Sequence, residues 1–235
     1  MLSKNKIKYI RSLELKKKRK VGQVLLAVLI ATSNWLKMNH SATANEIIEV
    51  TQEELSRASL QKTPQEVLAV FVQPSYDLNP EVIKSSLCLA LDDVQDPGSL
   101  GTIIRLADWF GIEHIFCSTG TADVYNPKTV QATMGALARV KVHYCSLPQL
   151  IESLTDIPVY GTFLNGNIIY TESLSAHGLI VMGNEGKGVS LEVEKLINNK
   201  LYIPNYPQER ETSESLNVAI ATAVVCSEFR RRLLP

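Results

Sequence analysis

Short runs rich in apolar residues alternate with helical patterns over the second part of the chain. The runs at 87–91, 114–117, 140–143, 159–163, 179–182 and 201–203 predict strands. Segments with helical periodicity follow them at 100–110, 127–138, 147–154, 190–197 and 216–233. Because strand–helix alternation places helices on both faces of a parallel sheet, the pattern predicts an α/β domain with a mostly parallel sheet.

A smaller unit precedes this domain. Two prolines, Pro74 and Pro80, bracket polar turn formers and predict a linker over 73–86. Upstream, 47–50 and 67–72 have strand character, and 51–59 resembles a helix with Thr51 as N-cap and Glu54 at the capping-box position. We therefore expect a small α/β domain over 1–72 and a larger α/β domain over 87–235.

The charge of the chain is unevenly distributed. Its 24 Lys and Arg residues balance 24 Asp and Glu residues, but the first twenty residues hold nine Lys or Arg against the single acid Glu14. Such a basic arm can bind nucleic acid by releasing counterions from phosphates, and a solvated tail is the equally open alternative. The candidate RNA-binding residues of the arm are Lys4, Lys8, Arg11, Lys16, Lys17, Lys18 and Arg19.

Composition excludes several other classes. With 45% hydrophobic and 20% charged residues, the chain is unlike a disordered or multi-span membrane protein. The apolar run 24–31 after the basic segment imitates a signal peptide, but the basic lead is long and the run is too short to span a bilayer. We therefore expect a cytoplasmic protein with no membrane contact. We also expect no metal site, because none of the four cysteines has metal-ligand spacing to another ligand: Cys88, Cys117, Cys145 and Cys226.

Three loops carry the candidate chemistry, because ligands of parallel sheets bind beyond the carboxyl ends of the strands. The first, 96–105, is glycine-rich without matching a dinucleotide fingerprint or a P-loop. Two of its residues could have purely structural roles: Ser99 could be the N-cap of the helix, and Arg105 could form an ion pair with Asp108.

The second and third loops follow the strands 179–182 and 201–203. The second, 182–190, has three glycines around Glu185. Glu185 is either a functional acid or an ordinary solvent-exposed acid of the loop. In the third, Ser213 or Ser215 could cap the last helix. We place Asn217 inside the first turn of that helix, where its poor helix propensity suggests a functional reason.

Taken in this order, the three segments resemble the three motifs of the SpoU/TrmH family of RNA 2′-O-ribose methyltransferases over about residues 87–233. The resemblance implies a C-terminal trefoil knot, S-adenosylmethionine as cofactor and a homodimer. It implies methyl transfer to a ribose 2′-hydroxyl of structured RNA, with ribosomal RNA preferred to tRNA. A non-catalytic RNA-binding relative is the alternative function. A dinucleotide-dependent enzyme fits less well, because no acid follows the strand 114–117.

By position, the resemblance puts Arg105 at the catalytic arginine, Glu185 at the acid of the second motif, and Ser215 and Asn217 at the polar pair of the third. The family usually has Asn where this chain has Ser99, and Gly where it has Glu209. The residues expected to bind cofactor are Met182, Gly183, Gly188, Ile203, Leu216 and Asn217.

The N-terminal segment is also similar to this family, whose small RNA-recognition domain has ends resembling residues 2–5 and 60–65. Between these ends the chain is short, because 21–34 has no polar face or turn to support the usual strand, turn and helix. Either the domain is trimmed or residues are absent from the sequence, and we favour the second interpretation.

Overall fold

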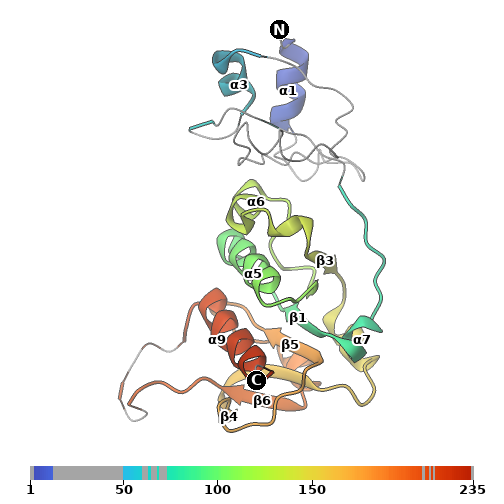
Figure 1. Ribbon diagram of the computed structural model, residues 1–235, viewed down its shortest axis with the longest axis vertical. Helices are drawn as coiled ribbons and strands as arrows, with labels where there is room; N and C mark the ends of the chain where they lie inside the picture. The colour runs from blue at the N-terminus through green and yellow to red at the C-terminus, as the bar shows by residue number, and fades with distance from the viewer. Residues whose placement is uncertain are drawn as a thin grey trace.

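The computed structural model describes residues 3–12, 50–59, 63–64, 68, 73–207, 210–211, 213 and 215–233. Within these residues the strands form one six-stranded sheet in the order β3-β2-β1-β5-β4-β6, and every pairing is parallel. The predicted parallel α/β architecture is therefore confirmed (Figure 1). The strands are β1 (Leu87–Leu91), β2 (His114–Cys117), β3 (Lys141–Tyr144), β4 (Val159–Ile168), β5 (Gly178–Met182) and β6 (Asn199–Tyr202).

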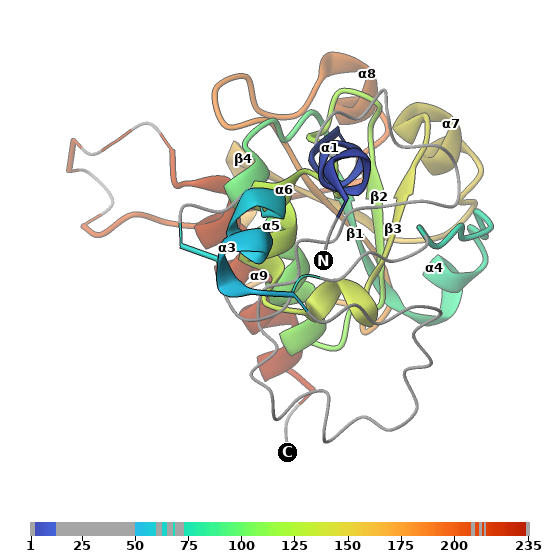
Figure 2. The ribbon, with the colours of Figure 1, turned by 90° about the horizontal axis from the view of Figure 1, so that it is seen from above.

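Helices cover both faces of the sheet, as the fully buried strands β1 and β5 require. Figure 2 shows α5, α6 and α9 on one side of the strands and α4 and α7 on the other. Leu89 and Leu91 of β1 belong to a core cluster with residues of α5 and α9, whereas Cys88 and Ala90 pack with α4, α7 and α8. The helices are α4 (Val82–Ser85), α5 (Pro97–Trp109), α6 (Pro127–Thr133), the 3₁₀ turn η2 (Ala136–Ala138), α7 (Leu147–Glu152), α8 (Leu191–Glu194) and α9 (Val218–Arg231).

The starts of two helices differ from the prediction. Asp96, not Ser99, caps α5, because its side chain accepts the N–H of Ser99 and Pro97 suits the first helical position. Asn217 is not inside the first turn of α9 but is its N-cap: Oδ1 accepts the N–H groups of Ala219 (3.0 Å) and Ile220 (3.3 Å). The alternative caps Ser213 and Ser215 are therefore wrong, and Asn217 has a structural function of its own.

The N-terminal residues described in the structure contain two helices, α1 (Lys4–Ser12) and α3 (Gln52–Ala58). The predicted capping box of Thr51 and Glu54 is confirmed. Ile10 of α1 packs with Ala58 of α3, and Arg11 Nη1 donates to Arg57 O over 3.2 Å. The start of the basic arm is thus a helix rather than a tail. The predicted strands 47–50 and 67–72, the basic residues 16–19 and the segment 21–34 lie wholly or largely outside the described residues.

The four cysteines are free; Cys88, Cys117 and Cys226 are buried, and Cys145 is half-buried. Burial raises the pKa of the Cys88 and Cys226 thiols to about 12, which keeps both protonated and unreactive. None of the helices in the described part of the chain combines the length and apolar character that a bilayer crossing needs.

Gly101 allows α5 and α6 to approach closely, which generates a first prediction. A Cβ atom at this position would lie 2.4 Å from Thr129 O and 2.6 Å from Ala132 Cβ. We expect Gly101→Ala to lower the free energy of unfolding by roughly 1–3 kcal/mol, although alanine favours helix by about 1 kcal/mol. Urea denaturation measures the change. Thr102→Ala, on the exposed side of the same turn, is the matched control, and equal stability of the two variants would contradict the prediction.

Candidate active site

The loops that follow β1 and β5 leave neighbouring strands at the same edge of the sheet and are hydrogen-bonded to each other. Asn184 Nδ2 donates to Asp93 O over 2.7 Å, and Ser190 N–H donates to Asp92 Oδ2 over 2.8 Å. A third, longer bond runs from Gln95 N–H to Glu185 Oε2 at 3.4 Å. The first two loops singled out in the sequence therefore form one unit.

The glycines of the second loop are required by the fold of the loop itself. Asn184 and Gly188 exchange two backbone hydrogen bonds of 2.9 and 3.0 Å, and Gly188 has a φ of +70°. A Cβ on Gly183 would lie 2.3 Å from the carbonyl carbon of Gly188. Gly183 therefore lets the two ends of the loop pack directly on each other, and Gly188 provides the left-handed backbone conformation that closes the loop.

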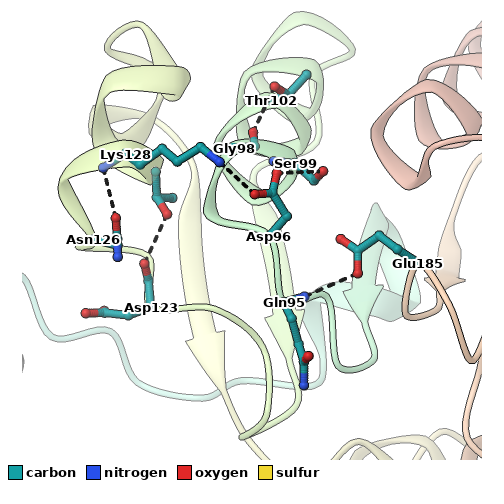
Figure 3. A network of polar contacts seen from close by, with 10 residues as sticks. Gln95, Asp96, Gly98, Ser99, Thr102, Asp123, Asn126, Lys128 and Glu185 are labelled. Atoms are coloured by element: carbon teal, nitrogen blue, oxygen red, sulfur yellow. Dashed lines mark hydrogen bonds and ion pairs between the residues drawn. The ribbon is translucent and has the colours of Figure 1, made fainter.

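Glu185 is not a solvated loop acid. Its Oε1 is buried and is the one buried side-chain nitrogen or oxygen in the described part of the chain that has no hydrogen-bond partner. Figure 3 shows the carboxylate opposite the start of α5, with Oε2 on the backbone of Gln95. An unsatisfied buried acceptor destabilises a fold by roughly 1–3 kcal/mol, and more when it is charged. Such an oxygen is available to a donor that a ligand brings.

The start of α5 is anchored to α6 through Asp96. Oδ2 of Asp96 accepts the backbone N–H of Ser99 (2.7 Å) and its hydroxyl (3.1 Å), while Oδ1 contacts Lys128 Nζ at 2.8 Å (Figure 3). The Lys128 ammonium and the Ser99 N–H lower the pKa of Asp96 to about 2. The buried Ser99 hydroxyl is thus committed to the helix cap.

Arg105 projects from the exposed side of α5, and the proposed pair with Asp108 is wrong. Asp108 is instead bound by Arg139 through two parallel hydrogen bonds, Nε to Oδ1 (2.8 Å) and Nη2 to Oδ2 (2.7 Å). The Arg139 guanidinium lowers the pKa of Asp108. Within the described residues Arg105 makes no hydrogen bond or ion pair, so its guanidinium is available to a ligand.

The third region leaves β6 at the outer edge of the sheet and returns to the centre through α9. Ile203 is half-buried, Ser215 and Leu216 are exposed, and Asn217 caps α9. Tyr202 Oη donates to Asn205 Oδ1 (3.0 Å), and Asn205 Nδ2 donates to Arg210 O (3.1 Å). No contact that the structure describes joins Ser215 to Arg105 or Glu185, so the structure brings together the first two loops and not the third.

The other residues named in the sequence lie as follows. Met182 is buried at the end of β5, Gly183 is half-buried and Gly188 is exposed. Lys4, Lys8 and Arg11 lie on α1. Sequence reasoning did not name the residues that hold the two loops together, although Asp96 and Asn184 lie within those loops. The only local signal for any of them was Asp96 before Pro97, which is typical of a helix start. The missed residues are Asp92, Asp93, Gln95, Asp96, Lys128 and Asn184.

With this geometry in place, a family model for the SpoU rRNA Methylase family matches residues 86–227. The chain belongs to this family. It is 34% identical over 184 residues to the 23S rRNA (guanosine(2553)-2′-O)-methyltransferase RlmP of Bacillus subtilis, covering 77% of this chain and 71% of RlmP.

Two solved structures extend the similarity to the whole chain. A protein from Porphyromonas gingivalis assigned to the TrmH family of RNA methyltransferases has a TM-score of 0.85 and 41% identity, with 99% of each chain covered. An AdoMet-bound rRNA methyltransferase from Sinorhizobium meliloti has a TM-score of 0.84 and 27% identity, with 100% of this chain and 97% of the other covered. The sequence resemblance to SpoU/TrmH enzymes is therefore confirmed, and S-adenosylmethionine is the cofactor of the family.

The anchor of α5 generates a second prediction. Because Lys128 is the main cause of the low pKa of Asp96, we expect Lys128→Met to return this pKa toward its ordinary value of 3.8. A carboxyl whose folded pKa is depressed contributes stability that is lost as pH falls through that pKa, so wild type should lose more stability than the variant between about pH 4 and pH 2. NMR titration of the Asp96 carboxyl carbon measures the shift.

Lys84→Met is the control for this variant, because Lys84 pairs with Glu81 in a similarly exposed ion pair remote from α5. It should leave the titration of Asp96 unchanged. An Asp96 carboxyl that already titrates near pH 4 in wild type would contradict the assignment.

Proposed function

We propose that this protein transfers the methyl group of S-adenosylmethionine to a ribose 2′-hydroxyl of structured RNA, with ribosomal RNA as the substrate. The observation that carries the proposal is the unpaired guanidinium of Arg105, which lies at the position of the catalytic arginine while its nearest acid in sequence is bound by Arg139. Membership of the SpoU family and the name of the RlmP relative support the choice of reaction. The cytoplasm, where ribosomal RNA is found, is the proposed location.

The residues present fit the cofactor. Gly188 is exposed and has nothing within 4 Å of the position that a Cβ would take, and Glu185 offers a buried oxygen without a donor. S-adenosylmethionine supplies an electrophilic methyl group on a sulfonium. In the proposal, the backbone around Gly183, Ile203 and Leu216 holds it, and the remaining contacts come from Met182, Gly188 and Asn217.

Arg105 acts on the developing charge of the nucleophile. A guanidinium stays protonated at physiological pH, so Arg105 is assigned to stabilise the alkoxide that forms at the 2′-oxygen and to bind the adjacent phosphate. The hydroxyl proton passes to a phosphate oxygen of the RNA.

Ser215 and Asn217 are assigned to orient the 2′-oxygen or the second loop. In Asn217 the side-chain oxygen is occupied by the N–H groups of α9, so Nδ2 is the atom left to donate.

Two further features of the resemblance belong to the proposal. β6 lies at the sheet edge beyond β4, yet α9 packs against α5, so the chain must cross back after β6, which is consistent with a trefoil knot. The exposed Leu216 and Ile220 at the start of α9 are proposed to face a second copy in a homodimer. The small N-terminal unit is proposed to recognise RNA through the arm, including the exposed Lys4 and Lys8 of α1.

Arg105→Ala tests the chemistry. We expect kcat to fall about a hundredfold or more, as for loss of an oxyanion donor, while cofactor affinity and Tm stay nearly unchanged. Arg105→Lys should also be badly impaired, because lysine keeps the charge but lacks the planar fork. Transfer of labelled methyl from S-adenosylmethionine to rRNA fragments gives kcat, and calorimetry gives cofactor affinity.

Lys195→Ala, an exposed cation on the other face of the sheet, is the matched control and should turn over normally. Near-normal turnover of Arg105→Ala would remove the catalytic assignment and favour a non-catalytic RNA-binding protein.

Glu185→Gln separates function from stability. The change removes the charge from a buried oxygen that has no donor, so Tm should stay the same or rise. Methyl transfer should nevertheless fall about a hundredfold, the low end for groups that act in a transition state. Thermal unfolding and single-turnover transfer are measured on the same samples. Glu192→Gln in the exposed first turn of α8 is the control and should change neither quantity. A parallel loss of Tm and activity in Glu185→Gln would show that Glu185 stabilises the fold and has no separate function in methyl transfer.

A further inference from the structure

Trp109, the last residue of α5, is 83% exposed although it is one of only two tryptophans in the chain. The inner side of α5 packs into the core through Ile103, Ile104 and Ala107. Trp109 lies on the outer side of the helix, one turn after Arg105. The indole therefore keeps its apolar area in contact with water in the free protein, and a partner that covered it would gain the free energy of burying that area.

Two arginines bind the residues on either side of Trp109 in the sequence. Arg139 binds Asp108, the residue before Trp109, and so neutralises the adjacent acid. Arg230 binds the two residues after Trp109, with Nε donating to Phe110 O (2.7 Å) and Nη2 to Gly111 O (3.1 Å). Both guanidinium groups keep N–H donors on Nη1 that these bonds do not use. The patch of Trp109, Arg105, Arg139 and Arg230 combines an aromatic face with positive charge.

The patch is separate from the apolar surface proposed for the dimer. The contact of Arg230 with Phe110 and Gly111 brings the carboxyl ends of α5 and α9 together. The exposed Ile220 and Leu216 lie at the opposite end of α9. Ten residues of helix between Ile220 and Arg230 span about 15 Å. Trp109 is therefore close in sequence to the residues that meet the carboxyl end of α9 at Arg230, and not to the end that carries Ile220 and Leu216.

We propose that this patch binds single-stranded RNA, with an unpaired base next to the methylated nucleotide stacked on the Trp109 indole and the backbone phosphates on Arg105, Arg139 and Arg230. The inference rests on the proposed function, which places the target ribose at Arg105. Four residues of helix separate Arg105 from Trp109, a rise of about 6 Å, so the strand that leaves Arg105 meets the indole within one turn. Unpaired RNA bases commonly stack on aromatic and guanidinium planes, largely without regard to sequence.

The test uses a Trp35→Phe background, in which Trp109 is the sole tryptophan and reports directly through its fluorescence. The probes are a short single-stranded oligoadenylate and the same strand paired with oligouridylate. We expect the single strand to quench Trp109 and Trp109→Ala to weaken its binding about tenfold or more, the usual loss for one stacked base. Trp109→Phe should retain most of the affinity, and duplex binding should change little.

Enzyme kinetics and oligomeric state complete the test. On rRNA fragments, Trp109→Ala should raise KM and leave kcat at saturating RNA nearly unchanged, since the residue binds substrate and does not touch the reacting atoms. Leu164→Ala, an exposed apolar residue on β4, is the control and should alter neither constant. Light scattering must show the same oligomeric state for Trp109→Ala and wild type.

Two outcomes would overturn the inference. Equal oligoadenylate affinity of Trp109→Ala and wild type would exclude base stacking, and dissociation of Trp109→Ala into smaller species would show that the indole is buried between copies of the chain. Failure of the proposed function gives a different result. A wild-type protein that transfers no methyl group but binds oligoadenylate through Trp109 would contradict the proposed reaction and support the RNA-binding patch.

Discussion

The hydrogen bond from Asn184 Nδ2 to Asp93 O joins the two loops on which the rest of the site depends. β1 and β5 are buried on both faces and are paired along their full length, so neither strand can offer chemistry except at the loop that follows it. Asn184 also orders its own loop, because its Oδ1 accepts the N–H groups of Gly186 and Lys187. One amide thus fixes the second loop and ties it to the first, and Glu185 is held opposite the start of α5 as a result.

The third loop is positioned from the other end of its helix. Glu228 of α9 is buried, and hydrogen bonds from Arg231 and Arg232 lower its pKa. Arg232 also donates to the backbone oxygens of Ile169 and Tyr170, while Arg230 holds the end of α5. These bonds set the axis of α9 relative to the sheet. Asn217, fourteen residues of helix away, is therefore placed by contacts that none of the three motifs contains.

The sequence predicted the strands and the starts of α6 and α7 well, but it misplaced the starts of α5 and α9. β1 and β2 were predicted with their observed bounds, because a buried parallel strand is a continuous apolar run with polar ends. The cap of α5 was missed because Asp96 and Pro97 lie outside the apolar period used to place the helix. Asn217 was misplaced because the apolar Leu216 before it extended the periodicity by one residue beyond the true cap.

For the site, the sequence named Arg105 and Glu185 but not the residues that hold them. Asn184 and Asp93 are 91 residues apart, and Lys128 is 32 residues from Asp96. No local pattern of apolar and polar positions encodes such pairs, since they form only when the sheet brings the loops together. The pairing of Asp108 with Arg139 has the same cause. The three-residue spacing on α5 allows Arg105 to contact Asp108, but Arg139, from another segment, binds Asp108 through two hydrogen bonds.

Ser99, which stands where the family usually has Asn, takes part in the cap of α5. Its hydroxyl donates to Asp96, and Asp96 is held by Lys128, so the start of α5 is stabilised as a helix cap with no side chain reaching the carboxylate of Glu185. Arg105 makes no hydrogen bond or ion pair within the described residues, and Oε1 of Glu185 has no donor, whereas Asp96 and Asp108 on the same helix and its cap are each bound by a cation. Folded proteins break local rules of polar satisfaction chiefly where function requires it. The coincidence of one free guanidinium and one bare carboxylate oxygen on the loop and helix of adjacent strands is therefore better explained by a ligand than by folding.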